Sequence, residues 1–237
     1  MTAKWNARTY TPRHDKWPYT PADFERYDPS PDAVFYQPSR LVTHIDDNAI
    51  SQLSRYYAEA LPSKGKILDF CSSWISHYPK ELESAIHSGD LKVVGMGMNK
   101  SELDANPILS QRIIKDLNED PTLPSDLTNL TAATCVVSID YLTRPVEVLK
   151  SIHHNMLPGS SVHLAISNRC FPTKAIRRWL DISENDRLEL VGDYLWFAGF
   201  RNIEMLTLSD GTTAGGTGLS KLFGRCDPLW IVRGKKV

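Results

Sequence analysis

From residue 46 onward, short apolar segments alternate with segments of helical periodicity, and this alternation limits the folds open to the chain. Apolar runs bounded by polar or glycine-containing turns predict strands that are buried on both faces. The predicted strands are residues 66–70, 91–96, 112–115, 133–139, 162–167, 203–208 and 229–232. The predicted helices are residues 46–61, 79–87, 101–110, 145–156 and 174–180, with a further segment at 191–200.

Helices between fully apolar strands indicate parallel β-α-β units, whose right-handed crossovers build an open sheet covered on both faces. We therefore predict an α/β fold with a doubly wound, mostly parallel sheet. The last two strands are joined by a glycine-rich loop at residues 210–218, which indicates a C-terminal antiparallel hairpin. Pro158 and Gly159 are expected to form the turn into the strand at 162–167.

Residues 1–40 differ in composition from the rest, and we treat them as an N-terminal arm that precedes a main domain at residues 41–237. The arm holds six of the fifteen prolines and eight aromatic residues. Because proline fixes φ and lacks an N–H donor, little regular structure is expected there. A disordered linker is usually poor in aromatic residues. The arm therefore either wraps over the main domain and buries its rings or forms a partly flexible tail.

Charge and cysteine content restrict the ligand class and the compartment. The formal net charge is −1, with 27 basic and 28 acidic side chains, so no strong field favours nucleic acid or an anionic membrane. The four cysteines form no CxxC pair, so we expect reduced thiols, no metal site and a cytoplasmic protein. No apolar run approaches the roughly 20 residues that span a bilayer, and the first residues lack a signal-peptide pattern.

Polar residues follow five of the predicted strands, at the edge where an open α/β sheet binds its ligands. In chain order they are Asp69, Cys71, Ser72, Ser73 and Trp74; Asn99; Asp116 and Leu117; Ser138 and Tyr141; and Asn168 and Arg169. The sequence therefore predicts one ligand site at this edge.

The order of these motifs resembles the class I S-adenosylmethionine-dependent methyltransferases, and within them the type 11 group, over roughly residues 67–208. Leu68-Asp69 resembles the first motif of that family, and Asp116-Leu117 resembles the acidic loop that contacts adenine. Residues 136–141 followed by 145–149 resemble the fourth-strand motif, and residues 157–159 resemble the turn before strand five. The resemblance implies S-adenosylmethionine as cofactor and Asp69, Asp116, Leu117 and Ser138 among its contacts.

Two departures from the family pattern affect the cofactor site. The family continues its first motif as D-x-G-x-G-x-G, whereas residues 69–77 read DFCSSWISH. Serine hydroxyls donate to carboxylates, so we expect Cys71, Ser72 and Ser73 to line the methionine end of the cofactor. Alternatively, this loop closes over a lost site. The missing G-x-G-x-x-G phosphate turn argues against a dinucleotide oxidoreductase.

The second departure follows strand two, where the family usually has an acid that accepts hydrogen bonds from the ribose hydroxyls. The equivalent residue here is Asn99, with Glu102 as a nearby substitute. An asparagine carbonyl accepts such bonds without the added strength of a negative charge.

The remaining assignments follow from residue type and place. We expect Arg40 to pair with the methionine carboxylate of the cofactor, because a guanidinium matches carboxylate geometry. His44 and His77 are the candidate general bases. The candidate acceptor-binding residues are Tyr36, Trp74, Tyr141, Asn168 and Arg169. Asp46 is expected to cap the helix that follows it.

These observations predict a methyltransferase that uses S-adenosylmethionine and acts on a small-molecule acceptor. The alternative is a catalytically inactive methyltransferase-like protein that binds or regulates a partner, as the missing glycines and the aromatic arm would allow. The near-neutral charge argues against a nucleic-acid methyltransferase. The acceptor atom and the oligomeric state stay open.

Overall fold

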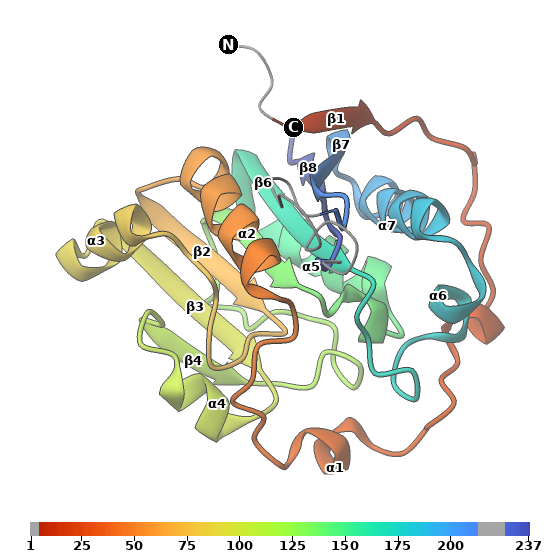
Figure 1. The fold of residues 1–237 in the computed structure, drawn as a ribbon, viewed down its shortest axis with the longest axis horizontal. Coiled ribbons are helices and arrows are strands. Elements are labelled where there is room, and N and C mark those ends of the chain that lie inside the picture. The colour runs from red at the N-terminus through yellow and green to blue at the C-terminus, as the bar shows by residue number, and fades with distance from the viewer. Residues whose placement is uncertain (1–4, 213–225) are drawn as a thin grey trace, which may run out of the picture.

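The computed structural model describes residues 5–212 and 226–237, and its centre is an eight-stranded mixed sheet (Figure 1). The strand order is β1-β7-β8-β6-β5-β2-β3-β4. The strands are β1 Asn6–Thr9, β2 Gly65–Phe70, β3 Leu91–Gly97, β4 Gln111–Ile114, β5 Leu130–Val136, β6 Met156–Ser167, β7 Arg201–Ser209 and β8 Leu229–Lys235. Strands β2 to β6 run parallel, and β8 is antiparallel to both β6 and β7.

Helices cover both faces of this sheet (Figure 1). They are η1 Pro21–Phe24, α1 Asp32–Tyr36, α2 Asp47–Ala60, α3 Lys80–Ser88, α4 Lys100–Ala105, η2 Ile139–Tyr141, α5 Pro145–Asn155, α6 Arg177–Asp181 and α7 Glu184–Ala198. Successive strand residues point to opposite faces. Leu68 accordingly packs in the cluster that includes α5 and α7, whereas Ile67 packs with α2 and α3. Within residues 5–212 and 226–237, no helix is long and apolar enough to cross a membrane.

The predicted fold class is confirmed. The sheet is mostly parallel, and β7 and β8 form the predicted antiparallel pair. The chain runs outward from β2 through β3 to β4, then returns to β5 on the other side of β2. This reversal at the centre of the sheet is where α/β proteins of this kind bind ligands. The predicted glycine-rich loop at residues 210–218 lies largely outside the described residues.

Several predicted boundaries differ from the structure for local reasons. Helix α4 ends at Ala105 rather than at residue 110, because Asn106 is extended and Pro107 cannot continue a helix. Helix α7 begins at Glu184, where the Ser183 hydroxyl accepts the Asp186 N–H, so the predicted segment 191–200 covers mostly its second half. Helix α6 is shorter than predicted and spans five residues.

Two further expectations concern helix and strand ends. Asp46 caps α2 as predicted, because its carboxylate accepts the Ala49 N–H at 2.8 Å. Pro158 and Gly159 do not form a turn before β6. They lie within β6, where the pairing with β5 shifts register and Gly159 has φ +83°. Glycine adopts this left-handed conformation without a steric cost.

The arm has more regular structure than its prolines suggest. Strand β1 extends the sheet antiparallel to β7, and η1 and α1 follow before the chain enters the main domain (Figure 1). Tyr10 is buried, and Trp17 packs against Phe24 and Tyr194. Tyr27 is 68% exposed, so the arm buries some of its rings and leaves others in solvent.

The Asp193 carboxylate on α7 anchors the first part of the arm. It is buried and accepts hydrogen bonds from the hydroxyls of Tyr10 and Tyr19, both at 2.5 Å, and from the Arg13 guanidinium at 2.7 Å. Burial and these bonds raise the pKa of both tyrosines, so the hydroxyls keep their protons and remain donors. One buried charge on the main domain thus holds three arm residues.

Substituting Asp193 tests how much this anchor contributes to the stability of the fold. We expect Asp193→Ala to lower the free energy of unfolding by about 3 kcal/mol, since three hydrogen bonds worth about 1 kcal/mol each are lost. Tyr19→Phe removes one of them and should cost about 1 kcal/mol. Urea unfolding followed by tryptophan fluorescence gives both values. Equal losses in the two variants would contradict the shared-anchor arrangement.

Candidate functional site

A cavity of about 410 Å³ lies at the carboxyl ends of the central strands, beside the point where the strand order reverses. Small-molecule sites usually enclose about 300–1,000 Å³. The cavity lining includes the following predicted residues: Tyr36, Arg40, His44, Asp69, Cys71, Ser72, Ser73, Trp74, His77, Asn99, Asp116, Leu117, Ser138, Tyr141 and Arg169. Asn168, in contrast, is exposed and not part of this lining. The structure therefore brings all but one of the predicted residues to one cavity.

The turn after β2 is held by the buried carboxylate of Asp69. Its Oδ2 accepts the hydroxyls of Ser72 and Ser76, both at 2.7 Å, and its Oδ1 accepts the Thr134 hydroxyl at 3.1 Å. Burial raises the pKa of Asp69, and the three hydroxyls oppose that rise. Ser72 donates its proton within the protein, so the expected hydrogen bond from Ser72 to a bound carboxylate is not available in this arrangement.

Left-handed residues shape the cavity wall. Cys71 has φ +53°, His77 has φ +57° and Val137 has φ +41°, and all three line the cavity. Non-glycine residues adopt this region uncommonly, and such strain concentrates at ligand sites. Cys71 occupies the position of the first glycine in the D-x-G motif, so the turn keeps a glycine-like conformation without glycine.

Gly97 ends β3 where the chain passes close to the turn after β2. A Cβ atom at Gly97 would lie 2.2 Å from the Ser72 carbonyl oxygen, and the Ser72 N–H donates to Met96 at 2.8 Å. The two backbone segments therefore touch, and no side chain fits between them. Packing therefore excludes an aspartate or glutamate side chain at position 97, the end of β3.

Asn99 does not serve as predicted, because its amide is fully used within the protein. Its nitrogen donates to the carbonyls of Tyr36 at 2.8 Å and Gln37 at 3.0 Å. Its oxygen accepts the Glu102 N–H at 3.0 Å and the Ser39 hydroxyl at 3.1 Å. An amide has two donor and two acceptor positions. Asn99 caps α4 and holds the arm, and the ribose assignment is corrected accordingly.

Glu102 brings a carboxylate to the cavity one helical turn after Asn99. Its Oε1 accepts the Arg40 N–H at 2.7 Å, and its Oε2 accepts the Ser73 hydroxyl at 2.6 Å. The two oxygens have about four acceptor positions in total. Glu102 thus joins the arm, the turn after β2 and the cavity.

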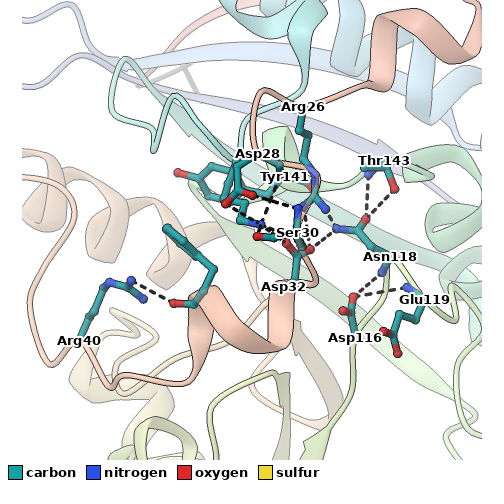
Figure 2. A network of polar contacts seen from close by, with 12 residues as sticks. Arg26, Asp28, Ser30, Asp32, Arg40, Asp116, Asn118, Glu119, Tyr141 and Thr143 are labelled. Atoms are coloured by element: carbon teal, nitrogen blue, oxygen red, sulfur yellow. Dashed lines mark hydrogen bonds and ion pairs between the residues drawn. The ribbon is translucent and has the colours of Figure 1, made fainter.

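The loop after β4 presents Asp116 and Leu117 to the cavity, as predicted. The Asp116 Oδ1 accepts the Asn118 N–H at 2.8 Å, which shapes the loop, and Leu117 is buried below it. The Asn118 side chain then donates to Asp32 at 2.8 Å and accepts the Thr143 N–H at 2.8 Å (Figure 2). Asn118 was not assigned a role from the sequence.

Asp32 is a second residue that sequence reasoning missed. Its buried carboxylate lines the cavity and contacts the Arg26 guanidinium at 2.7 Å, the Lys174 ammonium at 3.3 Å and the Asn118 amide (Figure 2). Lys174 is fully buried and also donates to the Ser30 carbonyl at 2.7 Å. The sequence contains no local signal for this cluster, since its members come from three distant segments.

Both predicted bases line the cavity, in different electrostatic settings. Burial and, to a smaller extent, the nearby charge of His44 lower the pKa of His77 to about 4. The His77 Nδ1 is buried without a hydrogen-bond partner among the described residues. Burial also lowers the pKa of His44, but the Glu102 carboxylate opposes that effect. At neutral pH His77 is therefore uncharged, with one ring nitrogen that donates and one that accepts a hydrogen bond.

Arg40 and an aromatic group close the arm side of the cavity. The Arg40 guanidinium donates to the Phe35 carbonyl at 3.0 Å, and its Cζ atom lies 4.5 Å from the Phe35 ring centroid and 5.5 Å from that of Phe171 (Figure 2). The Tyr141 hydroxyl accepts the Phe171 N–H at 2.9 Å. The Trp74 indole donates to the Val42 carbonyl at 3.0 Å. Arg40 is therefore partly used in holding the arm.

Among residues 5–212 and 226–237, no group of three or more His, Cys, Asp or Glu side chains could hold a metal ion. The four cysteines are free thiols. Burial raises the pKa of Cys170, which lines the cavity, so this side chain stays a neutral thiol.

A buried acid lies behind the cavity wall. Asp140, on η2, is 2% exposed, and its Oδ2 has no hydrogen-bond partner in the described part of the chain. Burial raises the pKa of Asp140 to about 8. Its carboxyl group is therefore protonated at neutral pH.

Asp140 should make stability depend on pH. An unfolded aspartate has a pKa of about 3.9, so the folded value is the higher one. The stability that comes from binding this proton is complete below about pH 4 and is lost as pH rises towards 8. Relative to the parent, Asp140→Asn should gain up to about 1.4 kcal/mol per pH unit in this window.

Urea unfolding of Asp140→Asn and the parent at pH 5, 6, 7 and 8 measures that difference. Asp126→Asn, an exposed change, is the control and should run parallel to the parent. Parallel curves for Asp140→Asn as well would contradict the assignment.

Gly97 offers a test of the close contact below the cavity. Gly97→Ala places a methyl group against the Ser72 carbonyl, so the turn must move. We expect a loss of about 1–3 kcal/mol in unfolding free energy, as for other overpacked sites. Thermal unfolding measures the loss. An alanine variant as stable as the parent would show that the two segments are not in fixed contact.

The comparisons with known proteins identify the fold. No family model matches the chain, and no curated protein matches it. The chain is similar to a S-adenosylmethionine-dependent methyltransferase from Archaeoglobus fulgidus, with 13% identity and a TM-score of 0.53 over 80% of this chain and 95% of that chain. It is also similar to a chain from the Haloferax volcanii complex of the Trm112 methyltransferase activator with a methyltransferase, with 10% identity and a TM-score of 0.56 over 80% and 91%.

The cyclase SpnF matches equally well, with 14% identity and a TM-score of 0.56 over 84% of this chain and 89% of that chain. At such identities the shared property is the arrangement of helices and strands. The chain therefore has the Rossmann-like fold of the S-adenosylmethionine-dependent methyltransferases.

Proposed function

We propose that this protein binds S-adenosylmethionine in the cavity beside β2, β3 and β4 and transfers its methyl group to a small-molecule acceptor. The observation that carries the proposal is the position of this cavity, at the strand reversal of a methyltransferase fold, with the carboxylates of Glu102 and Asp116 in its wall. No phosphate-binding glycine turn is present after β2, where residues 71–74 read CSSW. A nucleoside without phosphate suits this lining better than a dinucleotide does.

The residues present fit the cofactor in three parts. Glu102 has acceptor positions left for ribose hydroxyls, and Asp116 offers an acceptor to the adenine amine. Leu117 supplies apolar surface for the ring. The buried, unpartnered Nδ1 of His77 marks a place where a bound group would complete the hydrogen bonding.

Bound S-adenosylmethionine supplies a methyl group that its sulfonium has already activated. The protein then has to position the acceptor and exclude water, which is the larger part of catalysis for such a transfer. Tyr36, Trp74, Tyr141 and Phe171 give the cavity an aromatic wall on the arm side. Aromatic faces attract cations, so this wall also suits a positively charged sulfonium.

We assign the general base to His44 rather than His77. A base works best when its pKa lies near the working pH, and a pKa of about 4 makes His77 a weak proton acceptor. For His44, burial and the Arg40 charge lower the pKa, whereas the Glu102 carboxylate raises it and offsets part of that effect. His77 then orients the acceptor through a hydrogen bond.

Calorimetry with S-adenosylhomocysteine tests the proposal. We expect the folded protein to bind it with a micromolar Kd, and Asp116→Asn to weaken binding about tenfold through loss of a charge-assisted hydrogen bond. Asp126→Asn is the matched control at an exposed position. Absence of binding at millimolar ligand, with the protein folded, would remove the proposal and favour a binding or regulatory role.

A further inference from the structure

The arm is attached to the main domain in two different ways on either side of the cavity mouth. Before α1 ends, the attachment is a buried ionic cluster around Asp32, with Arg26 and Lys174 as partners (Figure 2). From the end of α1, residues 36–40 are held by hydrogen bonds from α4 and its cap and by the Arg40 guanidinium over the Phe171 ring. The first attachment involves desolvated charges, and the second lies partly in solvent.

The second attachment centres on two side chains of α4 and its cap. Asn99 binds the carbonyls of Tyr36 and Gln37, and the Glu102 Oε1 accepts the Arg40 N–H at 2.7 Å. Breaking these bonds exposes their groups to water, which replaces them at little net cost. Opening residues 36–40 therefore costs less than breaking the ionic attachment at Asp32.

Glu102 also belongs to the cavity wall, where it accepts the Ser73 hydroxyl. The other residues near the ends of β2 and β3 cannot accept hydrogen bonds from the ribose hydroxyls in this structure. Packing leaves no room for a side chain at Gly97, and the Asn99 amide has no free position. Asp69 is buried and already receives three hydroxyls. The remaining carboxylate at the tips of β2 and β3 is that of Glu102.

We infer that Glu102 accepts the ribose hydroxyls of the cofactor and, with the same carboxylate, latches residues 36–40 over the cavity, so that cofactor binding and arm closure strengthen each other. This inference rests on the proposed function. The coupling follows from linkage: a ligand that binds the closed arm better than the open arm shifts the population to the closed form. By the same rule, any change that weakens the latch also weakens binding of the ligand.

Amide hydrogen exchange of the full chain, with and without S-adenosylhomocysteine, tests the coupling. In the parent, the ligand should slow exchange of the Arg40 N–H, the latch donor, at least about tenfold. Glu102→Ala should weaken ligand binding about tenfold or more, as expected for hydrogen bonds to a charged group. In this variant the Arg40 N–H should exchange rapidly whether or not the ligand is bound. Glu81→Ala, an exposed change on α3, is the matched control and should behave as the parent.

A second pair of variants separates the backbone donor from the side chain. Arg40→Ala keeps the N–H that Glu102 accepts, whereas Arg40→Pro removes it. We expect Arg40→Pro to bind the ligand at least about threefold more weakly than Arg40→Ala, from the loss of one hydrogen bond. Equal affinities of this pair would overturn the latch.

The outcomes distinguish the coupling of arm and ligand from the proposed function. A parent protein that binds S-adenosylhomocysteine while Arg40 exchange is unchanged overturns the coupling and leaves the proposed function intact. Unaltered affinity in Glu102→Ala does the same. A folded parent that does not bind the ligand overturns the proposed function, and the inference with it.

Discussion

The carboxylate of Asp69 fixes the turn on which the cavity depends. Methyltransferase-like turns after the first central strand usually owe their shape to glycine, whereas this chain uses hydroxyl groups from Ser72, Ser76 and Thr134 gathered on one buried acid. Side-chain hydrogen bonds thus compensate for a backbone that must enter the left-handed region at Cys71. Because the Ser72 carbonyl also touches Gly97, the same turn sets the position of β3 and of the residues after it.

The fold was readable from the sequence because its strands are buried on both faces and leave continuous apolar runs. The region from β2 to β8 was anticipated in order and type, with most strand boundaries within a few residues. Strand β1 was not, since its four residues, NART, are all exposed at an edge of the sheet and carry no apolar pattern. Tertiary pairing with β7, rather than local preference, makes it a strand.

Predicted site residues at or just after strand ends, such as Asp69 and Asp116, line the cavity, and so do those predicted from the segment before β2. Asp32 was missed and Asn118 was given no role, because their partners lie far away in the chain and nothing in the local sequence signals a contact across 86 positions. Asn99 looked like a ligand residue by type, but its neighbours in space occupy its amide. Fold likeness leaves the chemistry open as well, because a cyclase shares this architecture. The chemistry of the cavity therefore depends on which polar groups around it are still free to contact a ligand.

Strand β8 lies between β6 and β7, so β7 and β1 reach the rest of the sheet only through it. Residues 6–9 are synthesised long before their sheet partner β7, and β7 joins the rest of the sheet only once β8 has also been made. Such non-local closure is slow to form. The arm is synthesised early but packs against the main domain late. During translation its aromatic rings are therefore exposed to chaperones and proteases before they can pack into the core of the protein.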